Sequence, residues 1–267
     1  MTWSGPDPLG AGRHTPRLDC AFESAWFDEL VVNRFDPETL VLLGRLSIAG
    51  TDSAVWEELW NELYHRHDSA VACAALPELA AIAAGGVPGD RYRAVSLAGA
   101  LLAAADPYTA EIRDRYAEDI CALLTEVGSE LAAGGPAIDS EPVVFLDRVH
   151  AMLTFEDAAG WSHRLLELVE AELEIECPVC WAAMTMHIGA SGSFTCTSGY
   201  PLDKVTKRQL IPANPDQLTG LGARLRRLAV AGRQATIARQ LTFLFGHAVC
   251  TENGHEFTPA DALAAMP

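Results

Sequence analysis

The feature that most constrains the fold is a long succession of amphipathic segments between residues 20 and 176. Apolar side chains recur there at helical spacing, and short breaks separate one segment from the next. Thr51, Asp52 and Ser53 offer an N-cap to one of these segments. No strand-like alternation precedes residue 180, and among the helices that we expect are those over residues 91–105, 108–132, 141–154 and 160–176. The pattern predicts a mainly α fold of antiparallel helix pairs, either a bundle or an α-solenoid.

Residues 74–83 favour the solenoid. They place Pro77 inside an apolar helical pattern, where a proline kinks or offsets the helix axis. The small alanine side chains around it let a neighbouring helix approach closely. We therefore expect a helical-repeat domain over residues 20–176, preceded by a flexible N-terminal segment over residues 1–19 and followed by a different unit over residues 177–267.

The charge balance restricts the partners of the chain. Its 267 residues contain 19 Lys and Arg against 36 Asp and Glu, which gives a net charge of −17. Sequence-independent binding to nucleic acid depends on clustered basic side chains, so this balance argues against a nucleic-acid partner and against anionic membrane surfaces. The locally basic stretch over residues 224–239 is interpreted as a solvated helical face that pairs with the acidic remainder. The acidic surface is interpreted either as a solvated surface that keeps the protein soluble by self-repulsion or, as the sharper alternative, as the binding surface for a basic protein partner.

The cellular location follows from three further observations. No segment approaches the ~20 continuous apolar residues that cross a membrane. The N-terminal residues lack the basic and apolar regions of a signal peptide. The seven cysteines are an odd number, and Cys20, Cys73 and Cys121 each sit in an apolar helical pattern, where a free cysteine behaves as a small hydrophobe. We expect a cytoplasmic protein with reduced thiols.

The segment Cys177-Pro178-Val179-Cys180 is typical of a zinc knuckle, because two thiolates separated by two residues can face one tetrahedral ion. The following residues 181–188 alternate, with Met184, Met186 and Ile188 on one face. A turn over residues 189–192 leads back into residues 193–197. A β-hairpin directly after a knuckle is the arrangement of a zinc ribbon.

The second half of the zinc site has two alternative ligands. Cys250 and His255 flank a glycine-containing turn in which Asn253 stands where a second thiolate would be, so Cys177, Cys180, Cys250 and His255 form one ligand set. Cys196 on the returning strand is the alternative to His255, and a degenerate site, two unliganded thiols or a redox pair are the other interpretations. Zinc that joins such distant segments is structural rather than catalytic.

Two parts of the chain resemble a known group. Residues 63–67 followed by residues 74–83 resemble a Leu-Tyr-His segment and an Ala-Leu-Pro helix in bacterial HEAT-repeat-like proteins of unknown function. Some members carry a split zinc-ribbon-like insert, opened by Cys-Pro-x-Cys and closed by Phe-Gly-x-Ala-x-Cys, which residues 177–180 and 245–250 match. This chain has Arg66 and His67 where that group has Gln and Gly. The resemblance implies a HEAT-like α-solenoid with a small zinc-ribbon-like hairpin near the C-terminus.

A second candidate site lies at the end of one predicted helix, where Tyr64, His65, His67 and Asp68 are concentrated. Histidines two residues apart do not share a helix face, and a histidine near a helix C-terminus is favoured by the macrodipole alone. We therefore weigh a helix cap against a binding or catalytic site. The chain also lacks common catalytic and nucleotide-binding motifs such as G-x-S-x-G, H-E-x-x-H and the P-loop.

Three functional hypotheses follow. The first is a non-catalytic protein–protein interaction module, a helical-repeat scaffold or an accessory or immunity-type protein, with a structural zinc site. The second is an enzyme of unrecognised type, for example in specialised metabolism, that uses the Tyr64, His65 and His67 region or an open zinc site. The third is a redox- or zinc-responsive regulator built on the knuckle.

Overall fold

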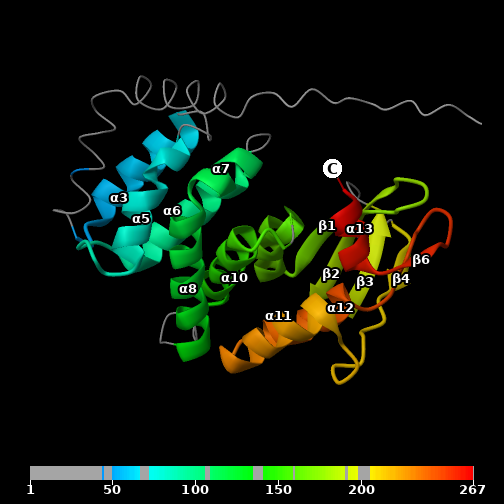
Figure 1. Ribbon diagram of the computed structural model, residues 1–267. Helices are drawn as coiled ribbons and strands as arrows, with labels where there is room; N and C mark the ends of the chain where they lie inside the picture. The colour runs from blue at the N-terminus through cyan, green and yellow to red at the C-terminus, as the bar shows by residue number, and fades with distance from the viewer. Residues whose placement is uncertain are drawn as a thin grey trace, which may run out of the picture.

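The computed structural model describes residues 44, 50–66, 72–105, 109–134, 141–158, 160–189, 192–197 and 205–266. The expected N-terminal segment over residues 1–19 and the first expected helices lie outside these ranges, as do His67 and Asp68. In the described part, the chain is mainly helical, and an antiparallel sheet lies beside the helices (Figure 1).

Helices make up most of the described residues before residue 171. Their bounds are α3 Ser53–Trp60, η1 Asn61–Arg66, η2 Cys73–Ala75, α5 Leu76–Ala83, α6 Arg91–Ala103, α7 Thr109–Arg115, α8 Ala117–Ala133, α10 Pro142–Phe155 and η3 Gly160–Glu170. The side chains of Asp52 and Asp90 cap α3 and α6, accepting hydrogen bonds from the N–H groups of Ala54 at 3.0 Å and Arg93 at 3.1 Å. No helix in these ranges is long and apolar enough to cross a membrane.

Pro77 lies at the start of an α-helix rather than inside one. It lies in the first turn of α5, directly after the short 3-10 helix η2. A proline is tolerated at that position because the first N–H groups of a helix have no intrahelical acceptor. The expected position inside a helix is therefore wrong, since the proline lies where the 3-10 conformation gives way to the α conformation, and a kink or offset of the axis stays a prediction.

The sheet has the order β1-β2-β3-β4 within the described residues, and every pair of neighbours is antiparallel. The expected hairpin is present as β2 Ala183–Gly189 and β3 Gly192–Thr197, with Met184, Met186 and Ile188 all buried. The outer strands are β1 Glu172–Glu176 and β4 Lys207–Gln209.

Strand β1 corrects the expectation of one helix over residues 160–176. The helical conformation ends at Glu170, and Ala171 has a φ of 59° that turns the chain out of the helix. The next residues alternate, with Leu173 and Ile175 buried between exposed or half-buried glutamates. Glutamate suits a helix by itself, but burial of the two apolar side chains against the sheet outweighs that local preference.

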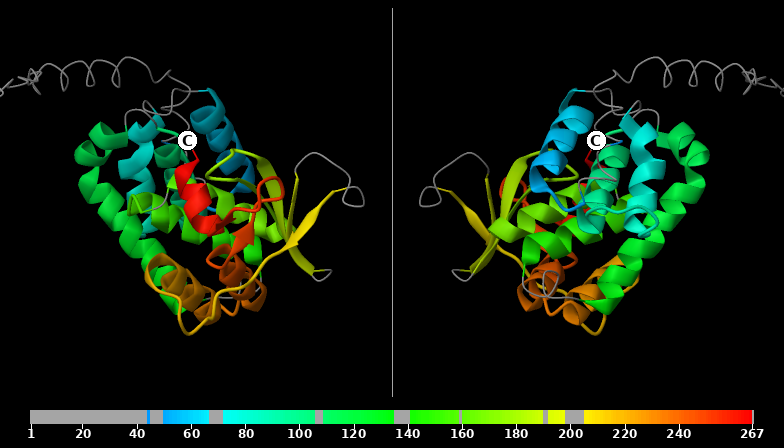
Figure 2. Two further views of the ribbon diagram at one scale, coloured as in Figure 1. Left: turned by 90° about the vertical axis from the view of Figure 1, so that its right-hand side faces the viewer. Right: turned by 90° about the vertical axis from the view of Figure 1, so that its left-hand side faces the viewer.

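The last part of the chain packs against both the helices and the sheet. It contains the two helices expected between residues 215 and 245, and its elements are α11 Gly220–Ala231, α12 Ala235–Leu244, β5 Ala248–Val249, β6 Glu256–Phe257 and α13 Pro259–Ala265. Helix α13 packs on β1 (Figure 2), and Arg224 of α11 forms a two-pronged ion pair with Glu156 beside the end of α10. Buried apolar residues from the helices and from the sheet form one core cluster. The division at residue 177 stays a prediction.

A buried arginine joins three helices. The side chain of Arg148 on α10 is fully buried, its guanidinium lies 3.7 Å from the centroid of the Tyr92 ring on α6, and its Nη2 donates to the Tyr92 carbonyl oxygen at 2.5 Å. Its Nε lies 3.3 Å from Oε2 of Glu130 on α8. Burial lowers the pKa of Arg148, and burial raises the pKa of Glu130 against the opposing effect of Arg148. The charged form of each side chain is therefore stabilised by the other.

We expect Arg148→Ala to lower the free energy of unfolding by about 3–5 kcal/mol, because it leaves the Glu130 carboxylate without its cation and opens a cavity between three helices. Chemical denaturation of the variant and of Arg227→Ala, which removes an exposed arginine from α11, measures this. The control is expected to stay within about 0.5 kcal/mol of the parent protein. A loss no larger than that of the control would contradict the assigned role.

Gly246 provides a second test of packing. A Cβ at this position would lie against the carbonyl oxygen of Ile211, 2.8 Å from the Ala213 nitrogen and 2.9 Å from the Thr242 oxygen. Because all three atoms belong to the backbone, we expect Gly246→Ala to destabilise the protein by about 1–3 kcal/mol in thermal or chemical denaturation. A Cβ on Gly128 of α8 meets nothing within 4 Å, so the matched Gly128→Ala is expected to stabilise by about 0.5–1 kcal/mol.

Candidate metal centre

The first cysteine turn joins β1 to β2. The N–H of Cys177 donates to the carbonyl oxygen of Ala182 at 3.1 Å, and the N–H of Trp181 donates to the carbonyl oxygen of Cys177 at 2.9 Å. The turn requires a left-handed conformation at Trp181, whose φ is 61°. These bonds fold the four residues from Cys177 to Cys180 back on themselves, with Cys177 buried and Cys180 exposed. We call residues 177–182 the first knuckle.

The second cysteine turn joins β5 to β6 and repeats this pattern. The N–H of Cys250 donates to the carbonyl oxygen of His255 at 2.9 Å, and the N–H of Gly254 donates to the carbonyl oxygen of Cys250 at 3.1 Å. Gly254 takes the left-handed position with a φ of 72°. We call residues 250–255 the second knuckle. In this register, Cys250 corresponds to Cys177, and Asn253 corresponds to Cys180.

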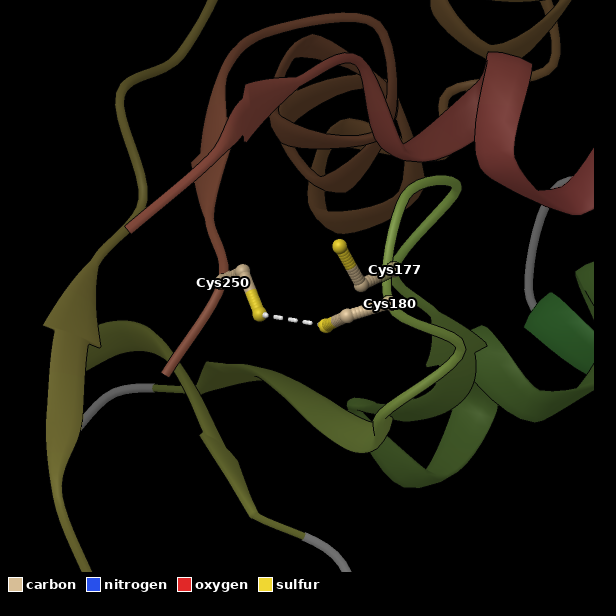
Figure 3. A group of neighbouring side chains, drawn as sticks. All are labelled: Cys177, Cys180 and Cys250. Carbon is tan, nitrogen blue, oxygen red and sulfur yellow. Dashed lines mark hydrogen bonds between the residues drawn. The ribbon is translucent and has the colours of Figure 1, made fainter. Parts of the chain in front are cut away.

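The two knuckles bring three thiols together. The Sγ atoms of Cys177, Cys180 and Cys250 all lie within 4.8 Å of one another, and those of Cys180 and Cys250 are 3.6 Å apart. In Figure 3 the side chains of Cys180 and Cys250 point toward each other, and that of Cys177 lies beside them. Zinc–sulfur bonds of ~2.3 Å in a tetrahedron place two sulfurs about 3.8 Å apart. The triad therefore has the spacing of three corners of a zinc tetrahedron.

The thiols influence one another's ionisation. Burial raises the pKa of Cys177, but hydrogen bonds from the N–H groups of Cys180 and Val179 and from the neighbouring thiols outweigh it, so the pKa is lowered. At Cys180 the N–H of Ala182 lowers the pKa, whereas desolvation and the other two thiols raise it above the ordinary value. Three adjacent thiolates repel one another, and a bound divalent cation removes that penalty.

The two alternative fourth ligands lie elsewhere. His255 is exposed, and its ring lies parallel to that of Phe257 at a centroid distance of 6.4 Å. Cys196 is buried on β3, where burial is the largest cause of its raised pKa. Among the described residues, neither side chain belongs to the group of donors within 4.8 Å of one another. The Nδ2 of Asn253 lies 3.9 Å from the Sγ of Cys177.

Two threonines hold the second knuckle against the sheet. Thr195 on β3 donates from its hydroxyl to the carbonyl oxygen of Val249 at 3.0 Å. The hydroxyls of Thr197 and Thr251 are 3.1 Å apart. Sequence reasoning did not identify these residues, because isolated threonines in a strand carry no signal that singles them out. Their contacts join β5 and the second knuckle to β3.

The second candidate site is described only in part. Tyr64 and His65 lie in the π-helical segment η1, and both are exposed. The Tyr64 ring lies 5.6 Å from the Trp60 ring and meets the His65 ring edge-on at 5.1 Å. His67 and Asp68 lie outside the described residues. The structure thus places an exposed aromatic pair here, and ligand binding by this region stays a prediction.

No protein-family model, curated protein or solved structure matches the chain.

The cysteine triad predicts one zinc ion per chain, measured by mass spectrometry of metals in protein purified under reducing conditions. Cys177→Ser and Cys250→Ser each remove one of three sulfur ligands, so we expect the zinc content to fall by at least tenfold. Cys121→Ser and Cys196→Ser serve as matched controls from outside the triad and are expected to retain zinc. Loss of zinc in Cys196→Ser with retention in Cys250→Ser would contradict the assignment.

Proposed function

We propose that this protein is a non-catalytic protein–protein interaction module, a HEAT-like helical scaffold whose C-terminal part is held together by structural zinc. The observation that carries the proposal is the gathering of Cys177, Cys180 and Cys250 from segments that lie 70 residues apart in sequence. Three thiols in a reduced state also suit a cytoplasmic location.

Zinc suits this site because of the type of its ligands and because a metal ion would stabilise the second knuckle. Thiolates are soft ligands that favour zinc over magnesium or calcium, and Cys-x-x-Cys turns are common in structural zinc sites. The second knuckle joins strands of only two residues each, β5 and β6. A two-stranded ribbon of this length is marginally stable on its own. A metal cross-link to the first knuckle would therefore contribute much of the stability of the second knuckle.

The first knuckle also supports a partner surface. The side chains of Val179 and Trp181 are 58% and 60% exposed, and we call these two residues the knuckle tip. Trp181 keeps a left-handed backbone, which costs a bulky residue about 1 kcal/mol, whereas the second knuckle has Gly254 at the corresponding position. An exposed tryptophan at a strained position is typical of a binding residue, because tryptophan is enriched in interface hot spots.

The charge of the chain supports a partner of a definite class. At −17 the protein attracts basic surfaces over a distance of about 8–10 Å at physiological ionic strength. The proposed partner is therefore a basic protein that receives the knuckle tip in an apolar pocket. The resemblance of the helical segments to HEAT-repeat-like proteins supports the scaffold role, since stacked helix pairs provide extended binding surfaces.

Trp181→Gly separates partner binding from folding. Because glycine adopts the left-handed conformation without strain, we expect this variant to retain zinc and to be stabilised by about 1 kcal/mol in denaturation. Affinity purification of the tagged chain from its own cells, with partners quantified by mass spectrometry, is expected to show at least a tenfold loss of a basic protein recovered by the parent chain.

The control for this experiment is Val230→Ala, which truncates an exposed apolar side chain on α11, away from the knuckles. It is expected to recover the partner as the parent chain does. Equal recovery of the partner by Trp181→Gly, or recovery of no stable basic partner by the zinc-loaded parent chain, would contradict the interaction role. Absence of zinc from the parent chain would contradict the structural metal site.

A further inference from the structure

The second knuckle is a zinc knuckle with one ligand position altered. Its backbone hydrogen bonds match those of the first knuckle residue for residue, from Cys250 to His255 as from Cys177 to Ala182. In the first knuckle the position three residues after the leading cysteine is Cys180, and in the second it is Asn253. The corner of the tetrahedron that a fourth cysteine would occupy is therefore next to a carboxamide.

Hydrogen bonds determine which way that carboxamide faces. The N–H of His255 donates to Oδ1 of Asn253 at 2.9 Å, just as the N–H of Ala182 reaches the Cys180 thiol in the first knuckle. Since an N–H requires an acceptor, the oxygen of Asn253 is the atom on that side, and Nδ2 is directed to the Sγ of Cys177 at 3.9 Å. An amide NH₂ donates hydrogen bonds and has no lone pair for a metal.

The altered corner is accessible from outside. Cys180, Asn253, Gly254 and His255 are all exposed, whereas Cys177 and Cys250 are buried. A metal held by the triad would thus have two sulfurs on its inner side, with the exposed thiol and the amide on its outer side. A ligand arriving from solvent meets the outer side first.

We propose that the metal bound by Cys177, Cys180 and Cys250 takes an exogenous thiolate as its fourth ligand, with Asn253 donating a hydrogen bond to the ligand sulfurs. This inference rests on the proposed structural metal site. Zinc with three thiolates carries a net charge of −1, and a fourth thiolate completes the common four-sulfur set. The incoming thiol releases its proton to solvent and displaces a water molecule, and no oxidation state changes.

Cobalt(II) reports on this site because its absorption depends on the number of sulfur ligands. We expect the full-length protein to bind one cobalt ion per chain, with sulfur-to-cobalt absorption that rises by about one third when 2-mercaptoethanol is added, as three sulfur ligands become four. Asn253→Cys is expected to show the four-sulfur spectrum without added thiol, and this spectrum is expected to stay unchanged when 2-mercaptoethanol is added. His255→Ala is expected to match the parent protein in both states.

Several results would overturn the inference. One is a cobalt-loaded parent protein whose spectrum does not change with 2-mercaptoethanol. Another is a His255→Ala spectrum that differs from that of the parent protein before thiol is added, since His255 would then be the fourth ligand. Failure of the parent protein to bind cobalt at all would instead overturn the proposed metal site, and the inference with it.

The source of the thiolate is tested with two probes of opposite charge. Glutathione is an anionic small thiol, and the tripeptide Lys-Cys-Lys carries a cysteine in the basic setting that a protein partner would provide. Because the chain is acidic, we expect the tripeptide to reach half-saturation at a concentration at least threefold lower than glutathione. The reverse order would support the thiolate ligand with a small-molecule thiol as its source.

Discussion

The arrangement of the C-terminal part depends on the meeting of two cysteine turns that are distant in sequence. One turn connects strands of the four-stranded sheet, and the other connects the two-residue strands β5 and β6. Threonine hydroxyls on β3 contact Val249 and Thr251, and α13 packs on both α12 and β1. A metal ion at the three sulfurs would convert this approach into a direct cross-link.

The helical part and the sheet are joined by an ordinary apolar core, but charged groups direct parts of that packing. Arg148 fixes the relation of α6, α8 and α10, because a fully buried guanidinium requires its anionic and aromatic partners to stay in place. Arg224 performs a related task at the surface by joining α11 to Glu156 near the end of α10. Within the locally basic stretch, Arg224 thus contacts an acidic neighbour, and Arg239 lies over the ring of Phe243.

The structure agrees with the sequence-based predictions where the local sequence pattern is strong. Alternation in residues 181–188 identified a strand, and the structure has β2 over Ala183–Gly189 with the expected buried face. Residues 172–176 alternate as well, but acidic side chains and a preceding helical pattern concealed β1, which only pairing with β2 reveals. Trp181 shows the same limit, since its left-handed backbone depends on the turn that it belongs to rather than on its residue type.

The sequence by itself determined that this chain is mainly helical, acidic and provided with a Cys-x-x-Cys turn before a hairpin, because periodicity, charge and short cysteine spacing are local properties. Only the tertiary structure decided which distant side chain joins that turn. It brings Cys250 to the pair. The ligand atoms of His255 and Cys196 do not belong to the group of donor atoms that lie within 4.8 Å of one another. The physical reason is that the second knuckle repeats the backbone of the first, so its fourth residue, Asn253, faces the site, while His255 follows the chain into β6.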